Sequence, residues 1–425
     1  MGTFRRLPLS DVLGPRGYIR GPFGSALVRA ELQDHGIPVY EQQHAITGTR
    51  AFRYFIDEGK LSELARFQIH PNDLIVSCSG TVGSISVIQP DDPLGIISQA
   101  LLILRPRTDL VLPEFLFYFL ATSEGKHAIT QASHGSVQVN IAPRAVVEQI
   151  EMPVPSLNEQ RAIVDTLGAF DSKIELNRRM SQTLESMARA LFKSWFVDFD
   201  PVRAKAEGRE SGFPSHLAHL LPSSFADSEL GEIPSDWRVC GLDEIADFLN
   251  GLALQRFPAN IGRALPAIKI AQLHAGNAYG ADQVSADIPS DYVIQDGDVL
   301  FSWSGSLAVE LWCGGPGALN QHLFKVTSQH FPKWFYYHWT CRHLADFAEI
   351  AAGKATTMGH IQRGHLSAAK VVVPPASVLD AMTHAFQPLL DDLVATRLQS
   401  RKLAETEATL LPRLVSGDLD FANRG

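Results

Sequence analysis

Residues 77–83 read SCSGTVG and residues 302–308 read SWSGSLA, so one chain carries nearly the same seven-residue motif twice. We call this motif the repeated phrase. An aspartate and a short apolar run precede each phrase, in DLIV from Asp73 and in DVLF from Asp298. The phrases lie too far apart for a solenoid, whose units repeat every ~20 to 50 residues. In a chain of 425 residues, each phrase is therefore expected in its own domain-sized half.

The residues around the two phrases predict the same series of elements. Residues 70–90 and 295–313 alternate like two strands joined at a turn that contains glycine. An aromatic helical segment follows in each half, LPEFLFYFLATSEGKHAI (112–129) and FPKWFYYHWTCRHLADF (331–347), and then a polar loop and a strand bounded by prolines. The shared order predicts a mixed α/β fold built as an internal repeat.

A long helix is expected after each half. One seam steps alternately by four and three through Ile163, Leu167, Phe170, Ile174, Asn177, Ser181, Leu184, Ala188, Leu191 and Trp195. A second seam, with polar breaks at the same places, runs through Met382, Phe386, Leu389, Leu393, Thr396, Ser400, Leu403, Glu407, Leu410 and Leu414. Heptad seams predict a coiled coil, and ~38 residues of helix would span ~57 Å. Pro388 should kink the second helix or end its first turns.

The boundaries follow from these segments. Residues 197–216, VDFDPVRAKAEGRESGFPSH, are rich in charge, proline and glycine and predict an exposed connection. The expected parts are a globular domain over 1–156, a helix over 157–197, a linker over 198–235, a second domain over 236–375 and a second helix over 376–416. A shared seam requires the second helix to run back. We therefore expect two similar heads, related by a pseudo-twofold repeat and separated by two antiparallel coiled-coil helices.

Composition narrows the class of protein. Hydrophobic residues make up 45% and charged residues 20% of the chain, as in ordinary globular proteins. No apolar stretch reaches ~18 residues, and the start MGTFRRLPLSD lacks an apolar signal core, so a cytoplasmic location without a membrane partner is expected. Four cysteines without CxxC spacing predict neither a zinc site nor disulfides. A net charge of −9 argues against coating nucleic acid by charge alone, but leaves sequence-specific reading open.

Several motifs together resemble one known family. They are GPFGS (21–25), GIPVY (36–40), PNDLIVSCSGTVG (71–83), PSLNEQRAIVDTLGAFDSKIELNRR (155–179) and LFKSWFVDFDPVRAKAEGR (191–209). In this combination the chain resembles, over nearly its whole length, the specificity subunit of type I restriction-modification enzymes. The run from 191 to 209 is the most specific part, because a helix, an aromatic end and this linker rarely occur together.

The resemblance implies a non-catalytic DNA-recognition subunit. Its two domains would be target-recognition domains, each reading one half of a split site on double-stranded DNA. Its helices would be conserved regions that dock methyltransferase subunits, two of them, and restriction subunits would join the complex. The partners would use S-adenosylmethionine, ATP and Mg²⁺, and this chain would hold no cofactor or metal. Because the heads differ in sequence, the half-sites should differ too.

Two other functions stay open. One is a self-sufficient restriction-methylation enzyme, and the other is a structural adaptor that reads no DNA. The enzyme is disfavoured because the chain has neither a GxxxxGK[ST] phosphate loop nor an NPPY-like methyltransferase motif. SCSGTVG also lacks the GxSxG pattern of a nucleophilic serine, so its small residues predict a tight turn instead.

Candidate DNA-contacting residues are polar residues in the loops of both heads. In the first head they are Arg20, Gln42, Gln43, His44, His134, Ser136 and Gln138, and in the second head Lys269, Gln272, Lys354, Thr356, Thr357 and His360. Arginine suits a phosphate, amides pair with adenine, and lysine suits guanine. The first head has 13 Lys and Arg against 15 Asp and Glu, and the second 10 against 12. Each head alone should therefore bind DNA weakly, with the methyltransferase clamping the duplex.

The aromatic end of the first long helix is a candidate subunit interface. Within FKSWFVDF, the residues Phe192, Trp195, Phe196 and Phe199 are denser than one seam requires. Exposed aromatic clusters often mark interfaces, so docking of a partner subunit is expected there. The alternative is an ordinary intramolecular coiled coil.

Overall fold

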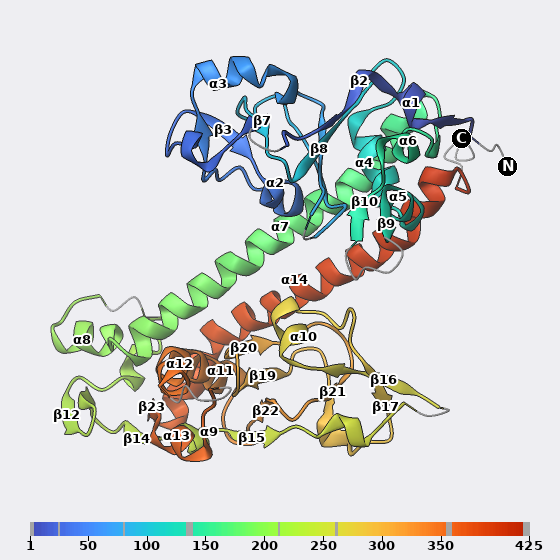
Figure 1. Cartoon of the computed structure of the whole chain (residues 1–425). Coiled ribbons are helices and arrows are strands. Elements are labelled where there is room, and N and C mark those ends of the chain that lie inside the picture. The colour runs from blue at the N-terminus through green and yellow to red at the C-terminus, as the bar shows by residue number, and fades with distance from the viewer. Residues whose placement is uncertain are drawn as a thin grey trace. The chain divides into compact units, whose positions relative to one another are not determined.

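The computed structural model divides the chain into two compact units (Figure 1). It describes residues 4–23, 26–79, 81–132, 139–210, 213–259, 262–353 and 359–419. Unit 1 comprises residues 1–172 and 404–425, and unit 2 comprises residues 173–403. Each unit therefore contains one globular body and a segment of both long helices.

Unit 1 is built on a four-stranded antiparallel sheet. Its order is β2 (Leu13–Arg20), β8 (Leu101–Pro106), β5 (Leu74–Ser77) and β6 (Ile85–Val87). Leu74 and Leu102 face a core completed by α4 (Pro113–Ala121), whereas Ile75 and Ile103 face a second apolar cluster. Because both faces are buried, β5 and β8 read as continuous apolar runs rather than as alternating strands.

Smaller elements complete unit 1. They are β1 (Arg6–Pro8) paired with β11 (Glu151–Pro153), β9 (Thr130–Ala132) paired with β10 (Val139–Ile141), and the sheet β4 (Phe55–Ile56), β3 (Ile37–Tyr40), β7 (Ile96–Ile97). Short helices are α1 (Leu9–Val12), α2 (Gln42–Thr47), α3 (Glu58–Glu63), α5 (Ser123–Ile129) and α6 (Arg144–Val147). Strands β3 and β7 are parallel.

Unit 2 repeats this topology. Its main sheet is β15 (Asp247–Asn250), β22 (Leu323–Thr327), β19 (Val299–Ser302), β20 (Ala308–Leu311), again antiparallel throughout. The second sheet is β17 (Gln283–Ser285), β16 (Ala264–Ile268), β21 (Gly317–Leu319), β18 (Val293–Ile294), and β16 and β21 form its parallel pair. Strand β14 (Arg238–Gly241) pairs with β23 (Lys370–Val373). The matching strand orders confirm the predicted internal repeat.

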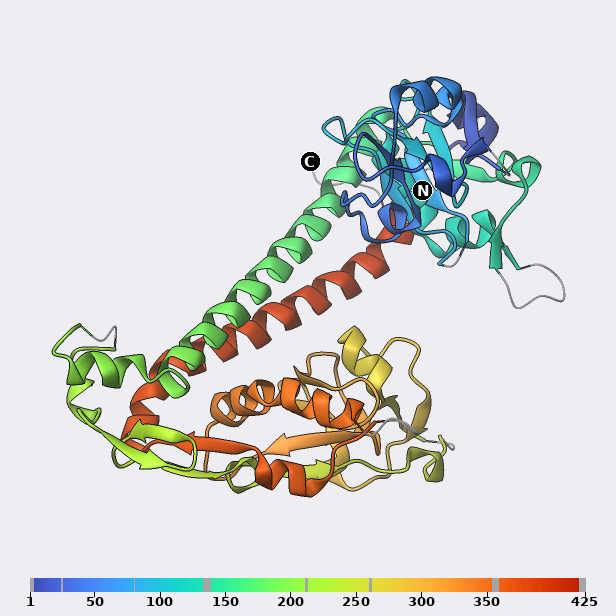
Figure 2. The same cartoon turned by 60° about the vertical axis from the view of Figure 1, so that its left-hand side comes forward.

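Helices cover one face of the main sheet in unit 2. They are α11 (Lys333–Arg342) and α12 (Leu344–Ala352), drawn in orange in Figure 2. Their side chains Trp334 and Phe347 are buried with Phe301 of β19 in one cluster. The remaining short helices are α9 (Leu242–Ile245), α10 (Ile270–Ala275) and α13 (Arg363–Ala368). The aromatic residues of the helical segment are therefore core residues.

The repeated phrase forms a hairpin loop in both units. The buried Ser77 hydroxyl donates to the carbonyl oxygen of Thr81 at 2.5 Å and accepts from the amide of Ser84 at 3.0 Å. The buried Ser302 hydroxyl donates to the carbonyl oxygen of Ser306 and accepts from the amide of Ala308, both at 2.7 Å. Each serine thus ties the two sides of its loop together. The prediction of a structural turn is confirmed.

The aspartate before each phrase also has a structural role. Asp73 accepts a hydrogen bond from the amide of His70 at 2.7 Å and pairs with Arg105 of the neighbouring strand at 2.7 Å. Asp298 pairs with Lys325, which also lies on the neighbouring strand, at 3.0 Å. Both carboxylates therefore hold the turn that enters the central strand.

The long helices are α7 (Leu157–Phe196) and α14 (Ala376–Ser416), and they lie antiparallel within each unit (Figure 1). In unit 1, Leu167 shares a core cluster with Leu414. In unit 2, the Asn177 amide donates to Gln399 Oε1 at 2.8 Å, and the Phe192 and Phe386 rings lie 6.2 Å apart. As α7 proceeds, its partners come from earlier turns of α14, as an antiparallel pair requires.

Helix α14 continues through Pro388 without a break. The expectation that proline ends the first turns is therefore wrong. Val378, Met382 and Phe386, which precede the proline, are buried in the core of unit 2. This packing holds the first turns in place despite the backbone hydrogen bond that proline removes.

The segment after α7 is packed, which corrects the prediction of an exposed connection. It forms α8 (Asp200–Ala206) and the hairpin of β12 (Phe225–Ser228) and β13 (Gly231–Pro234). Phe199, Val202 and Leu221 are buried in the core of unit 2. The ammonium group of Lys205 donates to two backbone carbonyls, at 2.9 and 2.5 Å. Apolar residues are sparse in this segment, and most of the larger ones are buried, although Leu230 is 49% exposed. Among the described residues, no helix is long and apolar enough to cross a bilayer.

Candidate nucleic-acid interface

In each unit, the end of the first strand of the main sheet, the turn before β8 or β22 and the start of α2 or α10 lie close together. We call this place the corner of the unit, and a glycine makes its close backbone contact possible. In unit 1, the Gly21 amide donates to the carbonyl oxygen of Leu101 at 3.0 Å, and a Cβ on Gly21 would lie 2.0 Å from a backbone oxygen of Ser98. In unit 2, Gly251 donates to Leu323 at 3.0 Å, and its Cβ would lie 2.2 Å from a backbone oxygen of Asn320. Only glycine allows this approach, which brings the end of the first sheet strand against the turn before β8 or β22.

A short helix starts at the same place in both corners. Helices α2 and α10 each follow a strand of the parallel pair and end at a left-handed glycine, Gly48 and Gly276. In α2, the Glu41 amide donates to His44 Nδ1 at 2.7 Å. In α10, the Lys269 amide donates to Gln272 Oε1 at 3.3 Å. The third helical residue therefore caps its own helix in both units.

This capping corrects the prediction for His44. Its side chain is fully buried, its Nε2 lies 3.1 Å from the carbonyl oxygen of Ala51, and its ring stacks on Phe52 at 4.7 Å. A ring enclosed in this way cannot reach a base edge. Gln272 uses its oxygen in the corresponding cap, so only its amide nitrogen is left for another partner. The signal in the sequence was a hydrogen-bonding side chain four residues after the strand end.

Two other predicted residues carry unused donors. Gln42 is the first residue of α2, and Arg20 is the last residue of β2. Among the described residues, Gln42 Nε2 and Arg20 Nε are buried atoms without a hydrogen-bond partner. A buried donor left unpaired costs roughly 1 to 3 kcal/mol, and the core indoles of Trp237 and Trp339 are in the same condition. Gln43 is exposed and makes only a long contact of 3.5 Å with the Ala51 carbonyl.

The corner of unit 2 carries a polar and aromatic cluster. The indole of Trp303 donates to Asn250 at 2.9 Å, and the Ser304 hydroxyl lies 3.0 Å from His322 Nδ1. His360 lies at the same corner, with its ring 6.1 Å from that of Trp303. Gln321 extends the cluster, with its amide 3.3 Å from His322 Nε2.

Lys269 borders this cluster. It is exposed, pairs with Asp282 at 2.5 Å, and lines a hollow of about 340 Å³ together with Gln321 and His322. Lys269 and His360 were predicted as DNA contacts, whereas Trp303, Gln321 and His322 were missed. Trp303 lies inside the repeated phrase, which offered a signal, because the first copy has Cys78 at that position.

Six predicted contacts cannot be placed. His134, Ser136, Gln138, Lys354, Thr356 and Thr357 lie outside the described residues.

The aromatic end of α7 is a core, not a surface. Phe192, Trp195, Phe196 and Phe199 are 0 to 6% exposed within this chain. Phe196 lies among the rings of unit 2, for example 5.7 Å from Trp334. The prediction that these four side chains form a subunit interface is therefore wrong. Residues of α11 and α14 cover the first three, and Phe225 and Trp237 cover Phe199.

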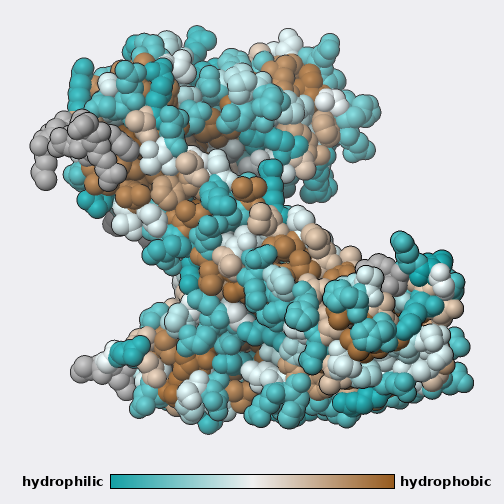
Figure 3. Space-filling view, turned by 180° about the vertical axis from the view of Figure 1, so that it is seen from behind, coloured by the Kyte–Doolittle hydropathy of each residue, from teal (hydrophilic) through white to brown (hydrophobic). Residues whose placement is uncertain are grey.

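A different face of α7 does expose apolar side chains. Leu176, Met180 and Met187 are 51, 45 and 53% exposed and lie on one side of the helix, with Thr183 between them. We call this set the α7 stripe. Viewed from behind, the hydrophobic surface of the molecule lies in separate patches among hydrophilic side chains (Figure 3). The stripe was missed because it lies outside the heptad seam.

The comparisons with known proteins agree with this architecture. Residues 30–186 match the family model described as the type I restriction modification DNA specificity domain. The HindI specificity subunit of Haemophilus influenzae is 23% identical over 375 residues, which cover 76% of this chain and 81% of that protein. The chain is similar in sequence to type I restriction enzyme specificity subunits. The MjaIX specificity subunit of Methanocaldococcus jannaschii is 25% identical over 320 residues, which cover 73% and 70% of the two chains.

A solved type I specificity subunit also shares the fold. The S subunit from M. genitalium aligns over 97% of this chain and 96% of its own, with a TM-score of 0.50 and 16% identity. The likeness confirms the expected fold class of mixed α/β domains with two long helices.

Proposed function

We propose that this chain is the DNA-recognition subunit of a type I restriction-modification complex and that each unit reads one half of an asymmetric, bipartite site. The observation that carries the proposal is the pair of corners, because one scaffold presents different polar groups in each unit. Arg20, Glu41 and Gln42 lie at one corner, and Asn250, Lys269 and Ile270 lie at the corresponding places in the other. A shared scaffold with exchanged side chains is suited to reading two different sequences.

The corner chemistry matches the edges of bases. A glutamine amide pairs with the N6 and N7 positions of adenine, and a lysine donates to the O6 and N7 positions of guanine. Gln42 and Gln43 therefore favour adenine in the first half-site, and Lys269 favours guanine in the second. The arginine at the end of β2 suits a backbone phosphate.

The chain is a specificity subunit and not the catalytic one. We propose that it holds no cofactor or metal and that partner subunits use S-adenosylmethionine, ATP and Mg²⁺. The hydroxyl of Ser77 is engaged by its own loop, and burial raises the pKa of the Cys78 thiol to about 11. Neither side chain of the repeated phrase is thus activated as a nucleophile.

The α7 stripe is the proposed docking surface for a methyltransferase subunit. Three exposed apolar side chains on one helical face can insert into an apolar groove of a partner. We propose two methyltransferase subunits in the complex, with restriction subunits joining it, although the stripe itself lies on α7 alone. This docking surface replaces the aromatic cluster that the sequence suggested.

The test is to map DNA methylation in a host that carries the complete system. The proposal expects one motif with two different specific blocks and a non-specific gap, which disappears when this chain is deleted. A single continuous block, or a motif that persists without the chain, would contradict it.

A further inference from the structure

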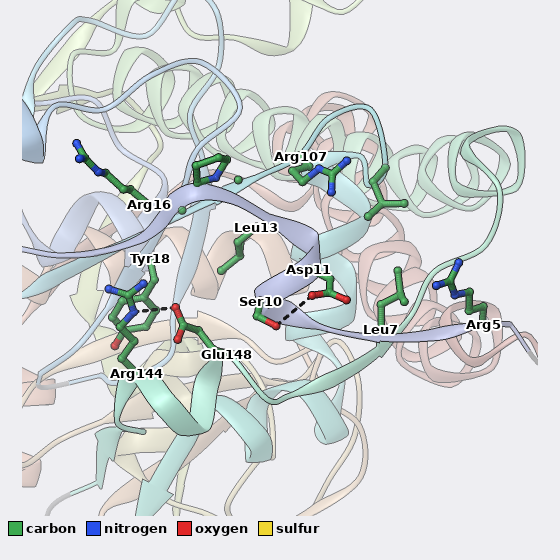
Figure 4. A pocket seen from close by; sticks show the side chains of 14 residues that line it. Arg5, Leu7, Ser10, Asp11, Leu13, Arg16, Tyr18, Arg107, Arg144 and Glu148 are labelled. Carbon is green, nitrogen blue, oxygen red and sulfur yellow. Dashed lines mark hydrogen bonds and ion pairs between the residues drawn. The ribbon is translucent and has the colours of Figure 1, made fainter.

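Unit 1 has a hollow lined by arginines beside β1 and the start of β2. The hollow measures about 690 Å³, and Arg5, Arg16, Arg107 and Arg144 reach it from different segments of the chain (Figure 4). Two acidic side chains, Asp11 and Glu148, also line it. Residues 1–156 as a whole contain more acidic than basic residues, so this concentration of positive charge is local.

The charges in the hollow are only partly paired. Arg144 donates to Glu148 at 2.7 Å, and Arg107 pairs with Asp109 at 2.9 Å. Within the described part of the chain, Arg5 and Arg16 form no ion pair. Surface pairs such as the first two are weak, so a multiply charged anion can compete for these arginines.

A second hollow continues the first toward the corner of unit 1. It measures about 420 Å³ and shares Tyr18 and Arg144 with the first. The Arg144 guanidinium lies 5.7 Å from the centre of the Tyr18 ring, so these two side chains join the hollows. Arg66 and Arg20 line the second hollow, and Arg20 belongs to the corner. We call the six residues Arg5, Arg16, Arg107, Arg144, Arg66 and Arg20 the arginine track.

Arg16 is held in the track by a bulge that unit 2 lacks. The β2–β8 register shifts between Leu13 and Tyr18, and Arg16 has a φ of +60°. A left-handed backbone is unfavourable for a residue other than glycine. From the end of α1 to Tyr18 the chain takes six residues, whereas from the end of α9 to the corresponding Phe248 it takes three. The strained insertion therefore places one extra arginine.

Most of the track has no counterpart in unit 2. Following the matching strands, turns and helices, Arg20 corresponds to Asn250, Arg66 to Asp291 and Arg107 to Gln329, while Arg5 corresponds to Arg238 and Arg144 to Arg363. With the inserted Arg16, four of the six positive charges are specific to unit 1. One of them is replaced by a negative charge.

We infer that the arginine track binds backbone phosphates of the DNA that flanks the first half-site, a contact that unit 2 does not make. This inference rests on the proposed function. Guanidinium groups bind phosphate oxygens in bidentate pairs, and a row of them follows a phosphate backbone. Phosphate contacts fix register and orientation without reading bases. The track thus orients an asymmetric protein on an asymmetric site.

The first experiment measures the salt dependence of binding. The methyltransferase complex, assembled with its full-length specificity subunit, is titrated with a duplex carrying the mapped motif at ~50 to 200 mM salt. Each lost phosphate contact should lower the slope of log affinity against log salt by ~0.9, so Arg16→Ala with Arg107→Ala should lower it by ~1.8. The matched control is Arg161→Ala, an exposed arginine of unit 1 on α7. A double-variant slope equal to that of the control would overturn the inference.

A second experiment needs no protein variant. Neutral methylphosphonates replace single phosphates in the DNA that flanks each half-site, and the half-site of unit 1 is the one that changes with Gln42→Ala. The wild-type complex should lose affinity for substitutions outside the half-site of unit 1 and keep it at the mirrored positions outside the other. Equal losses on both sides, or none on the first, would overturn the inference.

The two proposals fail in different ways. A wild-type complex without preference for the mapped motif over a scrambled duplex would contradict the proposed function. A complex that keeps its preference but shows an unchanged salt slope in the Arg16→Ala, Arg107→Ala variant would contradict only the arginine track.

Discussion

Glu41 and Lys269 occupy the same N-terminal cap position of α2 and α10, so the two units place opposite charges at matching points of one scaffold. The next residue differs as well, since Gln42 corresponds to Ile270. The caps themselves are alike, because the third residue of each helix bonds back to the cap amide. The two copies of the repeat thus share the hydrogen bond that caps the helix but differ in the side chains at and next to the cap.

The serine of the repeated phrase should stabilise its hairpin. Ser77→Ala removes two hydrogen bonds from a buried site and leaves the Ser84 amide without its acceptor. The free energy of unfolding should fall by ~1 to 3 kcal/mol. Denaturant unfolding measures this, with Ser79→Ala, an exposed serine of the same loop, as the control. If both variants lowered the free energy of unfolding equally, the Ser77 hydrogen bonds would not be what stabilises the hairpin.

The α7 stripe should carry the methyltransferase contact. Met180→Glu places a charge where an apolar side chain is expected to be buried in the complex. Burying a methionine is worth ~1.5 to 3 kcal/mol, so affinity for the methyltransferase should fall ~10-fold or more. Titration calorimetry of the two subunits measures the change. Gln182→Glu, at an exposed polar position of α7, is the control, and similar affinities for both variants would place the interface elsewhere.

The stability of unit 1 should depend on the protonation of Glu407. Burial, and then the charge of Asp171, raises its pKa to about 7. Because this pKa is raised on folding, the stabilising contribution is complete below the ordinary value of 4.5 and is lost as the pH rises through about 7. Glu407→Gln should therefore exceed the wild type in stability more at pH ~8 than at pH ~5.

Denaturant unfolding at the two pH values tests this difference. The control is Glu58→Gln, which changes an exposed glutamate of the same unit. A Glu407→Gln variant whose stability follows the wild type at both pH values would show that this carboxyl does not couple folding to pH.

The length of α7 should set the gap between the half-sites. Four residues inserted after Ser181 add about one helical turn, or ~6 Å, which is roughly two base-pair steps. The stutter in the heptad pattern also unwinds the coil locally, so the gap should grow by one or two base pairs. Motif mapping measures the gap. An active variant with the original gap would show that the helices do not set it.

The repeat and the helices could be predicted because their signals are local. The phrase at Ser77 and Ser302 combines a strand end with a turn, and heptad spacing needs no knowledge of partners. The role of His44 could not be assigned in this way, because a polar residue after a strand suits both a loop surface and a helix cap. Burial by Phe52 and the bond to Ala51 decide between them.

The interfaces depend on residues that are distant in the chain. The sequence shows that Phe192 and Phe196 are close together, but not that Trp334 and Phe386 cover them. The arginine track likewise assembles residues from five separate segments. Residues 1–156 contain more acidic than basic residues, so the net charge of the head does not reveal the local positive charge of the track.

The corner of each unit is proposed to read its own half-site. Gln42→Ala should relax recognition at one position of the first block, and Lys269→Ala at one position of the second, each by ~1 to 3 kcal/mol of discrimination. Gln89→Ala, an exposed glutamine away from the corner, is the control.

The most direct measurement is methylation profiling of every single-base variant of the mapped site with these three proteins. Each corner variant should change one block, the two blocks should differ, and the control should change neither. If Gln42→Ala and Lys269→Ala altered the same block, or lowered methylation of all sites uniformly, the assignment of one half-site to each unit would be contradicted.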